Sequence, residues 1–328
     1  MYKYTSAFRG RSVPVTHRVL YLFRALLNSH VCLSALKSLK GNNRTNSKRV
    51  VRFLNDITNG THGKGLDWFN SIVIRMRRSE TEIFDLFKGD KLTECGISVN
   101  ADQYADMLRG LESDGVIKIC GFLSKADAFD LGQQIRLIPG HTKSEDFEWN
   151  SLDDWLNSND SSPRFDTRSD LLSNIPMIIR ISRNNLLQKI ARDYIGVPPL
   201  IGDIQSWTTA VKRNLSEQDL EESAMALHCD SDYVKFIKIF LLLTDVDNDN
   251  GPFQFVLKSH RGRRHVAGRM PDSEIVSSSD TLFNGIGEAG DLLIVDTRGW
   301  HKATPVNIGH RTMVQLIFTS SYFGGQVA

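Results

Sequence analysis

Short apolar segments separated by turn residues fill the second half of the chain, and their spacing limits the fold more than any other feature. Each segment is rich in Val, Ile, Leu or Phe, and Gly, Pro, Asn or Asp residues lie between the segments, as is typical of β-strands. The predicted strands are Ile201–Val211, Val234–Thr244, Phe253–Leu257, Asp291–Asp296 and Arg311–Ser320. Strands at such intervals favour a jelly roll, the double-stranded β-helix of cupin type.

Helical signals precede these strands, so we expect a mainly β fold with flanking helices. Asn100 and Ser124 are good N-caps, and each predicts a helix that begins after it. A strand over Val116–Cys120 separates these two helices, and a third helix is predicted over Leu186–Gly196. Residues 141–163 are polar and acidic, which predicts a long surface loop of the kind that often covers a site.

The first hundred residues differ in charge from the remainder. Residues 1–79 contain 15 Lys and Arg but 2 Asp and Glu, whereas the rest of the chain contains 25 Lys and Arg and 36 Asp and Glu. This asymmetry predicts a basic, helical N-terminal extension over residues 1–100 and a jelly-roll domain over residues 101–328.

Within the extension, residues 17–40 carry apolar side chains at helical spacing with Arg and Lys beside them, which predicts an amphipathic helix. Three interpretations stay open: a helix packed on the domain, a helix that contacts a membrane surface or an anionic partner, and a cleaved transit peptide. Nucleic-acid binding is not expected, because few aromatic residues accompany the basic ones and the rest of the chain is acidic.

Cysteine usage indicates a reducing compartment. Cys32, Cys95, Cys120 and Cys229 form no Cys-x-x-Cys pair and no disulfide-like spacing. No apolar run has membrane-spanning length, and no signal peptide is apparent. We therefore expect a cytoplasmic protein, with membrane association through residues 17–40 left open.

A candidate metal site lies within the strand-rich half. In an extended segment, residues two apart project from the same face, so His228 and Asp230 form a two-point clamp. His301 follows a buried strand and is the natural third ligand. Two histidines and one carboxylate leave adjacent positions open on a metal ion, which suits non-haem Fe(II) that must bind a co-substrate and dioxygen together.

Three further polar residues lie in or next to the predicted strands. Arg311 begins one of them without a carboxylate neighbour in the sequence, which is hard to explain structurally. Lys238 interrupts an apolar strand, and Gln205 lies on the strand before the clamp. Each of these last two fits a surface residue as well as a pocket residue.

The order His228-x-Asp230, a long interval, His301 and then Arg311 resembles the Fe(II)/2-oxoglutarate dioxygenases, and within them the phytanoyl-CoA dioxygenase-like family. A Gly-Pro hairpin over residues 250–260 and the Gly-Asp pair before the distal His are similar to that family as well. The similarity covers roughly residues 105–322. The chain departs from the family in lacking its Pro-Gly-Ser-His sequence at residues 257–260 and in having Cys between the first two ligands.

This resemblance implies a function and assigns roles. His228, Asp230 and His301 would hold Fe(II), and Arg311 would bind the distal carboxylate of 2-oxoglutarate, with Gln205 and Lys238 as further co-substrate candidates. With dioxygen as the second co-substrate, the implied reaction hydroxylates an unactivated carbon of a small molecule, in a biosynthetic tailoring or metabolic step. In related halogenases a small residue replaces the carboxylate ligand, so Asp230 favours hydroxylation or desaturation.

Two other classes stay open at this point. The chain could be a cupin-like metal-binding domain that acts without 2-oxoglutarate, or a non-catalytic binding module recruited by the basic N-terminal helix. Arg311 separates these classes from the oxygenase, because neither needs a buried cation for a distal carboxylate. The sequence fixes neither the substrate nor the oligomeric state.

Overall fold

The computed structural model describes residues 99–142, 148–211, 224–230, 232–233, 235–261 and 282–320. The basic extension predicted over residues 1–100, including the amphipathic helix over 17–40, lies outside the described residues except for its last two positions. Among the described helices, none combines the length and the apolar composition that crossing a membrane requires.

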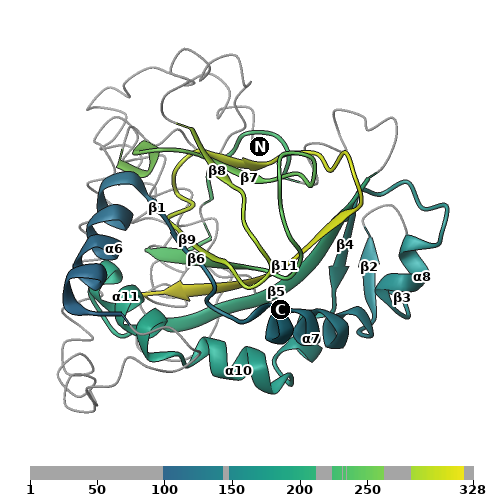
Figure 1. Cartoon of the computed structure of the whole chain (residues 1–328), viewed down its shortest axis with the longest axis horizontal. Helices are drawn as coiled ribbons and strands as arrows, with labels where there is room; N and C mark the ends of the chain where they lie inside the picture. The colour runs from purple at the N-terminus through teal and green to yellow at the C-terminus, as the bar shows by residue number, and fades with distance from the viewer. Residues whose placement is uncertain are drawn as a thin grey trace, which may run out of the picture.

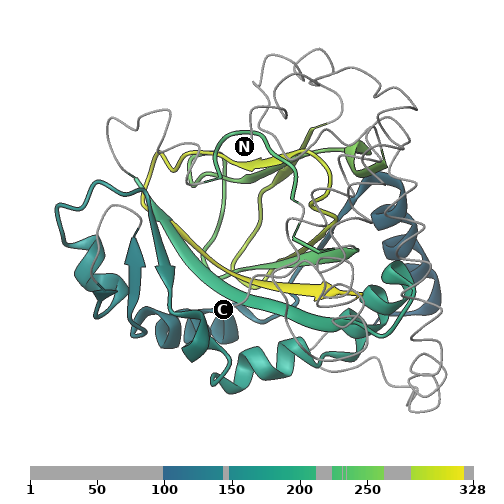
Figure 2. The same cartoon turned by 180° about the vertical axis from the view of Figure 1, so that it is seen from behind.

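Two antiparallel sheets face each other and form the core of the fold (Figures 1 and 2). The strands are β1 Val116–Ile119, β2 Gly140–Thr142, β3 Glu148–Trp149, β4 Arg164–Thr167, β5 Leu200–Ala210, β6 Phe236–Leu242, β7 Phe253–Val256, β8 Leu282–Gly285, β9 Leu292–Val295, β10 His301–Ala303 and β11 His310–Thr319. The large sheet has the order β1-β9-β6-β11-β5-β4-β2-β3, and the small sheet has the order β10-β7-β8. The predicted mainly β architecture is confirmed, and it is consistent with a jelly roll.

Strand β11 lies near the centre of the large sheet, between β6 and β5. The register pairs Arg311 with Thr209 of β5 and Gln315 with Gln205 of β5. On the other side, Ile317 of β11 pairs with Lys238 of β6. Three adjacent strands therefore carry the polar residues singled out in the sequence.

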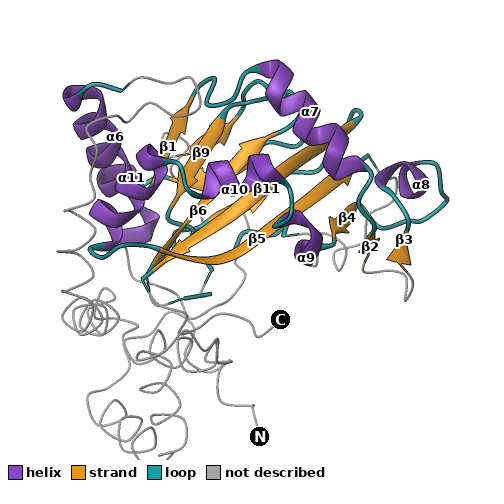
Figure 3. Cartoon of the chain, turned by 90° about the horizontal axis from the view of Figure 1, so that it is seen from below, coloured by secondary structure: helices purple, strands orange, loops and turns teal. Residues whose placement is uncertain are grey.

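Helices cover one face of the large sheet, as Figure 3 shows for α7, α10 and α11. The helices are α6 Ala101–Asp114, α7 Lys125–Arg136, α8 Leu152–Leu156, α9 Ser169–Leu172, α10 Pro176–Ser182 and α11 Asn185–Ile195, with a 3-10 turn at Ser259–Arg261. Asn100 caps α6 through a reciprocal capping box, and Ser124 caps α7. The helices predicted after Asn100 and Ser124 and the helix predicted over Leu186–Gly196 are confirmed.

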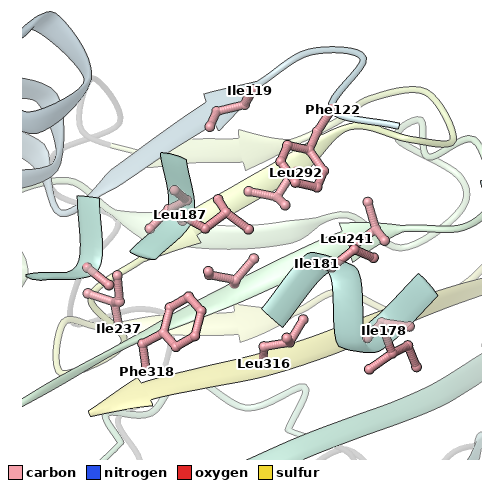
Figure 4. Packing of buried hydrophobic residues seen from close by; sticks show 14 of the residues in the cluster. Ile119, Phe122, Ile178, Ile181, Leu187, Ile237, Leu241, Leu292, Leu316 and Phe318 are labelled. Atoms are coloured by element: carbon pink, nitrogen blue, oxygen red, sulfur yellow. The ribbon is translucent and has the colours of Figure 1, made fainter. Parts of the chain in front are cut away.

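The main apolar core lies between these helices and the large sheet (Figure 4). Ile237, Ile239 and Leu241 of β6 point into this core, while Phe240 and Leu242 belong to a second cluster between the two sheets. This alternation follows the two-residue period of a strand. The face of the large sheet that looks toward the small sheet is therefore an interior surface as well.

The surface loop predicted over residues 141–163 is wrong in its described part. Residues 140–142 and 148–149 form β2 and β3 at one end of the large sheet, and α8 follows them. Trp155 is fully buried and stacks on Phe165 with their ring centroids 5.6 Å apart. The segment is polar on average but contains a few large apolar side chains, and burial of these side chains orders its backbone.

A glycine turn supports the strand that leads toward His301. Gly290 has φ +97°, and a Cβ added there would collide with the carbonyl oxygen of Leu123. We expect Gly290→Ala to lower the free energy of unfolding by more than about 1 kcal/mol, because strain and collision act together. Gly309 has φ +69° but open space around its Cβ position, so Gly309→Ala should cost less. Denaturant unfolding measures both values, and equal losses would contradict the steric argument.

Candidate active site

The small sheet carries the candidate ligands at its β10 edge. The backbone N–H of His228 donates to the carbonyl oxygen of His301 at 2.9 Å, and the reciprocal bond has the same length. The backbone N–H of Asp230 donates to the carbonyl oxygen of Thr297 at 2.8 Å. His228 thus forms an isolated antiparallel bridge, and the strand expected to carry His228 and Asp230 is reduced to this single pairing.

Three side chains converge at this edge. Nε2 of His228 lies 3.9 Å from Oδ1 of Asp230, and Nε2 of His301 lies 3.3 Å from Oδ2. One ligand atom from each residue lies within 4.8 Å of the other two. Within the described ranges, no other group of three or more His, Cys, Asp or Glu residues could hold a metal ion. The structure brings together the three residues that the sequence spacing singled out.

Both imidazole rings are oriented for ligation through Nε2. Nδ1 of His228 lies 2.8 Å from the carbonyl oxygen of Ala226, and Nδ1 of His301 lies 2.9 Å from that of Gly299. A carbonyl oxygen only accepts, so each Nδ1 carries a hydrogen, and Nε2 is the ring nitrogen available for a metal. This donor set fits a divalent transition metal.

The protonation states suit a metal as well. Burial lowers the pKa of His228 to about 4, and the neighbouring His301 adds to this effect, so the His228 ring is neutral near pH 7. Burial alone would raise the pKa of Asp230, but Lys238 and His301 outweigh it and hold this pKa well below its ordinary value. A neutral imidazole and an ionised carboxylate are the forms that bind metal.

A braced turn holds two of the three ligands. Asp296 is fully buried and accepts hydrogen bonds from the Tyr194 hydroxyl at 2.5 Å and from Nε of Arg298 at 2.6 Å. The same turn supplies the carbonyl oxygen that fixes the His301 ring and the one that fixes the Asp230 backbone. Tyr194 lies on α11, so this helix is connected to the ligands through Asp296.

Removing this brace should affect the ligands as well as the fold. Tyr194→Phe deletes a buried hydrogen bond to a carboxylate, so we expect a loss of about 1–3 kcal/mol in the free energy of unfolding. We also expect Fe(II) affinity to fall by several-fold, less than the roughly tenfold loss typical of direct ligand partners. Thermal unfolding and equilibrium metal titration measure the two effects.

The fold offers a matched control for this variant. Tyr104 donates to Asp193 of α11, also at 2.5 Å, but this pair has no bond to the turn that carries His301. Tyr104→Phe should lower stability and leave Fe(II) affinity unchanged. Equal metal affinity in the two variants would show that the brace serves stability alone.

Arg311 is the second feature of the site. It is 1% exposed on the interior face of β11, two residues from Met313 in the cluster between the sheets. Burial lowers its pKa to about 10, with Arg164 contributing, so the guanidinium remains charged near pH 7. No described residue accepts a hydrogen bond from its Nε or Nη1. A buried cation with free donors is costly unless an anion joins it, and the distal carboxylate of 2-oxoglutarate fits this need.

The two other co-substrate candidates have partners within the protein. Gln205 donates to Asp203 at 2.7 Å and accepts from Gln315 at 3.4 Å. Nζ of Lys238 lies 2.7 Å from Oδ2 of Asp230 and 2.9 Å from Oδ2 of Asp232. Burial by itself would lower the pKa of Lys238, but the two carboxylates raise it above its ordinary value. Lys238 is thus bound to a candidate metal ligand.

Sequence reasoning missed Asp232, Asp296 and Tyr194. Asp232 could have been found, because it continues the alternation that relates His228 to Asp230. Tyr194 and Asp296 lie 102 positions apart, and no local pattern connects them. Their contact follows only from the packing of α11 against the turn after β9.

A jelly roll with two histidines, a carboxylate and a buried arginine is typical of non-haem iron enzymes that use 2-oxoglutarate. The family model described as phytanoyl-CoA dioxygenase (PhyH) matches residues 111–312. The chain therefore belongs to the phytanoyl-CoA dioxygenase family, whose members use Fe(II), 2-oxoglutarate and dioxygen. A search of curated proteins found no match to the chain.

Solved structures are similar to this chain at low sequence identity. The epimerase SnoN, in complex with Fe3+, alpha ketoglutarate and nogalamycin RO, is 14% identical with a TM-score of 0.50 over 67% of this chain and 84% of SnoN. EvdO2 from Micromonospora carbonacea var. aurantiaca is 14% identical with a TM-score of 0.49 over 70% and 94% of the two chains. HygX from Streptomyces hygroscopicus, with nickel, 2-oxoglutarate and hygromycin B bound, is 14% identical with a TM-score of 0.46 over 65% and 86%. The SnoN match supports the fold assignment.

Proposed function

We propose that the chain is an Fe(II)- and 2-oxoglutarate-dependent oxygenase that hydroxylates an unactivated carbon of a small molecule. His228, Asp230 and His301 hold the iron, and Arg311 binds the distal carboxylate of 2-oxoglutarate. The observation that carries this proposal is the buried Arg311 with free Nε and Nη1 donors, on the face of the large sheet that also carries Lys238, a contact of Asp230. A metal site alone would not need such a cation.

Each residue has a definite task in this reaction. His228, Asp230 and His301 would hold the metal and would leave ligand positions for 2-oxoglutarate and dioxygen. Bound iron supplies the activation of dioxygen, coupled to oxidation of the co-substrate. Arg311 fixes the orientation of 2-oxoglutarate through a two-point contact. Phe253, whose ring centroid lies 5.6 Å from that of His301, limits the access of water to one side of the ligand.

Two arguments favour hydroxylation within this class. Asp230 fills the third protein position on the metal, so a halide has no vacated ligand position to take. Arg311 disfavours the alternatives of a metal-binding domain that acts without 2-oxoglutarate and of a non-catalytic binding module. SnoN is an epimerase, so the outcome of the reaction needs its own test.

The test uses the full chain with Fe(II), 2-oxoglutarate and isotopically labelled dioxygen, in the presence of pooled small molecules such as glycosides, aromatic polyketides and acyl thioesters. We expect succinate formation that depends on Fe(II), together with a product that has gained one labelled oxygen atom. Product of unchanged composition would indicate epimerisation, and loss of two hydrogens without added oxygen would indicate cyclisation or desaturation. Absence of succinate under all conditions would contradict the oxygenase proposal.

A further inference from the structure

Lys238 occupies an unusual position for a lysine. All seven residues of β6 are buried, and Lys238 is the one charged residue among them. It shares the interior face of the strand with Phe240 and Leu242. Its side chain is 10% exposed, so solvent does not hydrate the ammonium group freely. Such a group needs partners within the protein.

Lys238 and its two carboxylate partners form a group of three charges, and one of these partners, Asp230, is a candidate metal ligand. Nζ of Lys238 lies between Oδ2 of Asp230, at 2.7 Å, and Oδ2 of Asp232, at 2.9 Å. Oδ1 of Asp230 lies 3.9 Å from Nε2 of His228, and Oδ2 lies 3.3 Å from Nε2 of His301, so both carboxylate oxygens face a ligand nitrogen. The lysine therefore holds one oxygen of the candidate ligand and leaves the other outside its ion pair.

The balance of charge explains why two carboxylates are present. Lys238 with Asp230 alone would cancel the negative charge that attracts a metal cation, and would compete with the metal for that carboxylate. With Asp232 added, two carboxylates face one ammonium, and the group keeps one net negative charge. Lys238 and Asp232 thus form a neutral pair, and Lys238 is the member of this pair that contacts Asp230.

An unrestrained carboxylate can bind a metal through one oxygen or through both. Binding through both would occupy a position that 2-oxoglutarate or dioxygen requires. We propose that Lys238 and Asp232 form a neutral clamp that restricts Asp230 to ligation through a single oxygen and so keeps the co-substrate positions open. This inference rests on the proposed function, because it assumes that the site binds iron and 2-oxoglutarate.

Mn(II) provides a readout of the clamp without catalysis. The relaxation rate of water protons in the Mn(II)-loaded protein reports how many water molecules the metal binds. The wild-type site should show three, and Lys238→Met should lose one, a decrease of about a third, since the freed oxygen takes one open position. The affinity of the Mn(II)-loaded protein for 2-oxoglutarate should fall by about tenfold or more in the same variant.

A set of variants separates orientation from charge. The double variant Lys238→Met/Asp232→Asn has the same net charge as the wild type, so we expect it to fold and still lose one bound water. Lys238→Arg keeps an N–H donor for Asp230, so its bound Mn(II) should retain three water molecules. Asp232→Asn should also retain three waters but bind Mn(II) about tenfold more weakly, because the clamp then carries a positive charge. Circular dichroism checks the fold of each variant.

Two results would overturn the clamp. The first is a double variant that binds as many water molecules and binds 2-oxoglutarate as tightly as the wild type. This result would show that Lys238 and Asp232 only balance the charge of Asp230 and do not orient it. The second is a loss of 2-oxoglutarate affinity in Lys238→Met with all three waters still bound, which would make Lys238 a direct co-substrate contact. Failure of the wild-type protein to bind Mn(II) or 2-oxoglutarate would instead contradict the proposed function.

Discussion

Asp230→Ala is expected to lose iron binding and turnover together. One of three protein ligands disappears, so Fe(II) affinity should fall by more than about a hundredfold, beyond the range seen when an outer partner of a ligand is lost. Lys238 and Asp232 remain as an ion pair after the substitution, so no unpaired charge is left and the fold should survive. Anaerobic equilibrium dialysis with Fe(II) measures the affinity, and succinate formation measures the turnover.

Asp247 offers a matched control for this variant. It lies in an exposed turn, where its carboxylate accepts a hydrogen bond from the backbone of Asp249 at 2.8 Å. Asp247→Ala removes the same chemical group, and we expect wild-type iron affinity. If Asp230→Ala bound iron as tightly as Asp247→Ala, the assignment of the three ligands would fail.

Arg311→Lys is expected to weaken 2-oxoglutarate binding while leaving the metal site intact. Lysine keeps the positive charge but loses the planar two-point contact with a carboxylate. A charge-assisted hydrogen bond contributes about 1.5–3 kcal/mol, so the dissociation constant should rise by roughly ten- to a hundredfold. Anaerobic calorimetric titration of 2-oxoglutarate into the Fe(II)-loaded protein measures this change.

Three comparisons make the result specific. Arg109→Lys at an exposed position should bind 2-oxoglutarate as the wild type does. Arg311→Ala should bind it more weakly than Arg311→Lys, and a 2-oxo acid without the distal carboxylate should show a smaller difference between wild type and Arg311→Ala. Wild-type affinity in a folded Arg311→Lys variant, or loss of iron in that variant, would make Arg311 a structural residue.

Local signals in the sequence predicted the centre of the fold. The long predicted strands correspond to β5, β6 and β11, and β6, which is buried on both faces, has an almost continuous apolar run. The capping residues Asn100 and Ser124 fixed the starts of two helices. The spacing of His228, Asp230 and His301 predicted a cluster that the structure brings within 4.8 Å.

The short strands and the connections around the site could not be predicted in the same way. Strands β4, β8 and β10 have three or four residues, and pairing with neighbours defines them more than any pattern of their own. Trp155 lies in the segment predicted as a surface loop, but packing on Phe165 buries it. Lys238 was one polar residue in an apolar strand, and its partners Asp230 and Asp232 became visible only when the chain was folded.

The most direct test of the central claim is the visible absorption of the full chain after anaerobic addition of Fe(II) and then 2-oxoglutarate. Chelation of 2-oxoglutarate to iron held by two histidines and a carboxylate gives a weak charge-transfer band. We expect this band in the wild type, its absence in Asp230→Ala, and its appearance in Arg311→Lys only at higher 2-oxoglutarate concentration. If the wild-type protein bound Fe(II) but developed no band at saturating 2-oxoglutarate, the assignment of a 2-oxoglutarate-dependent oxygenase would be contradicted.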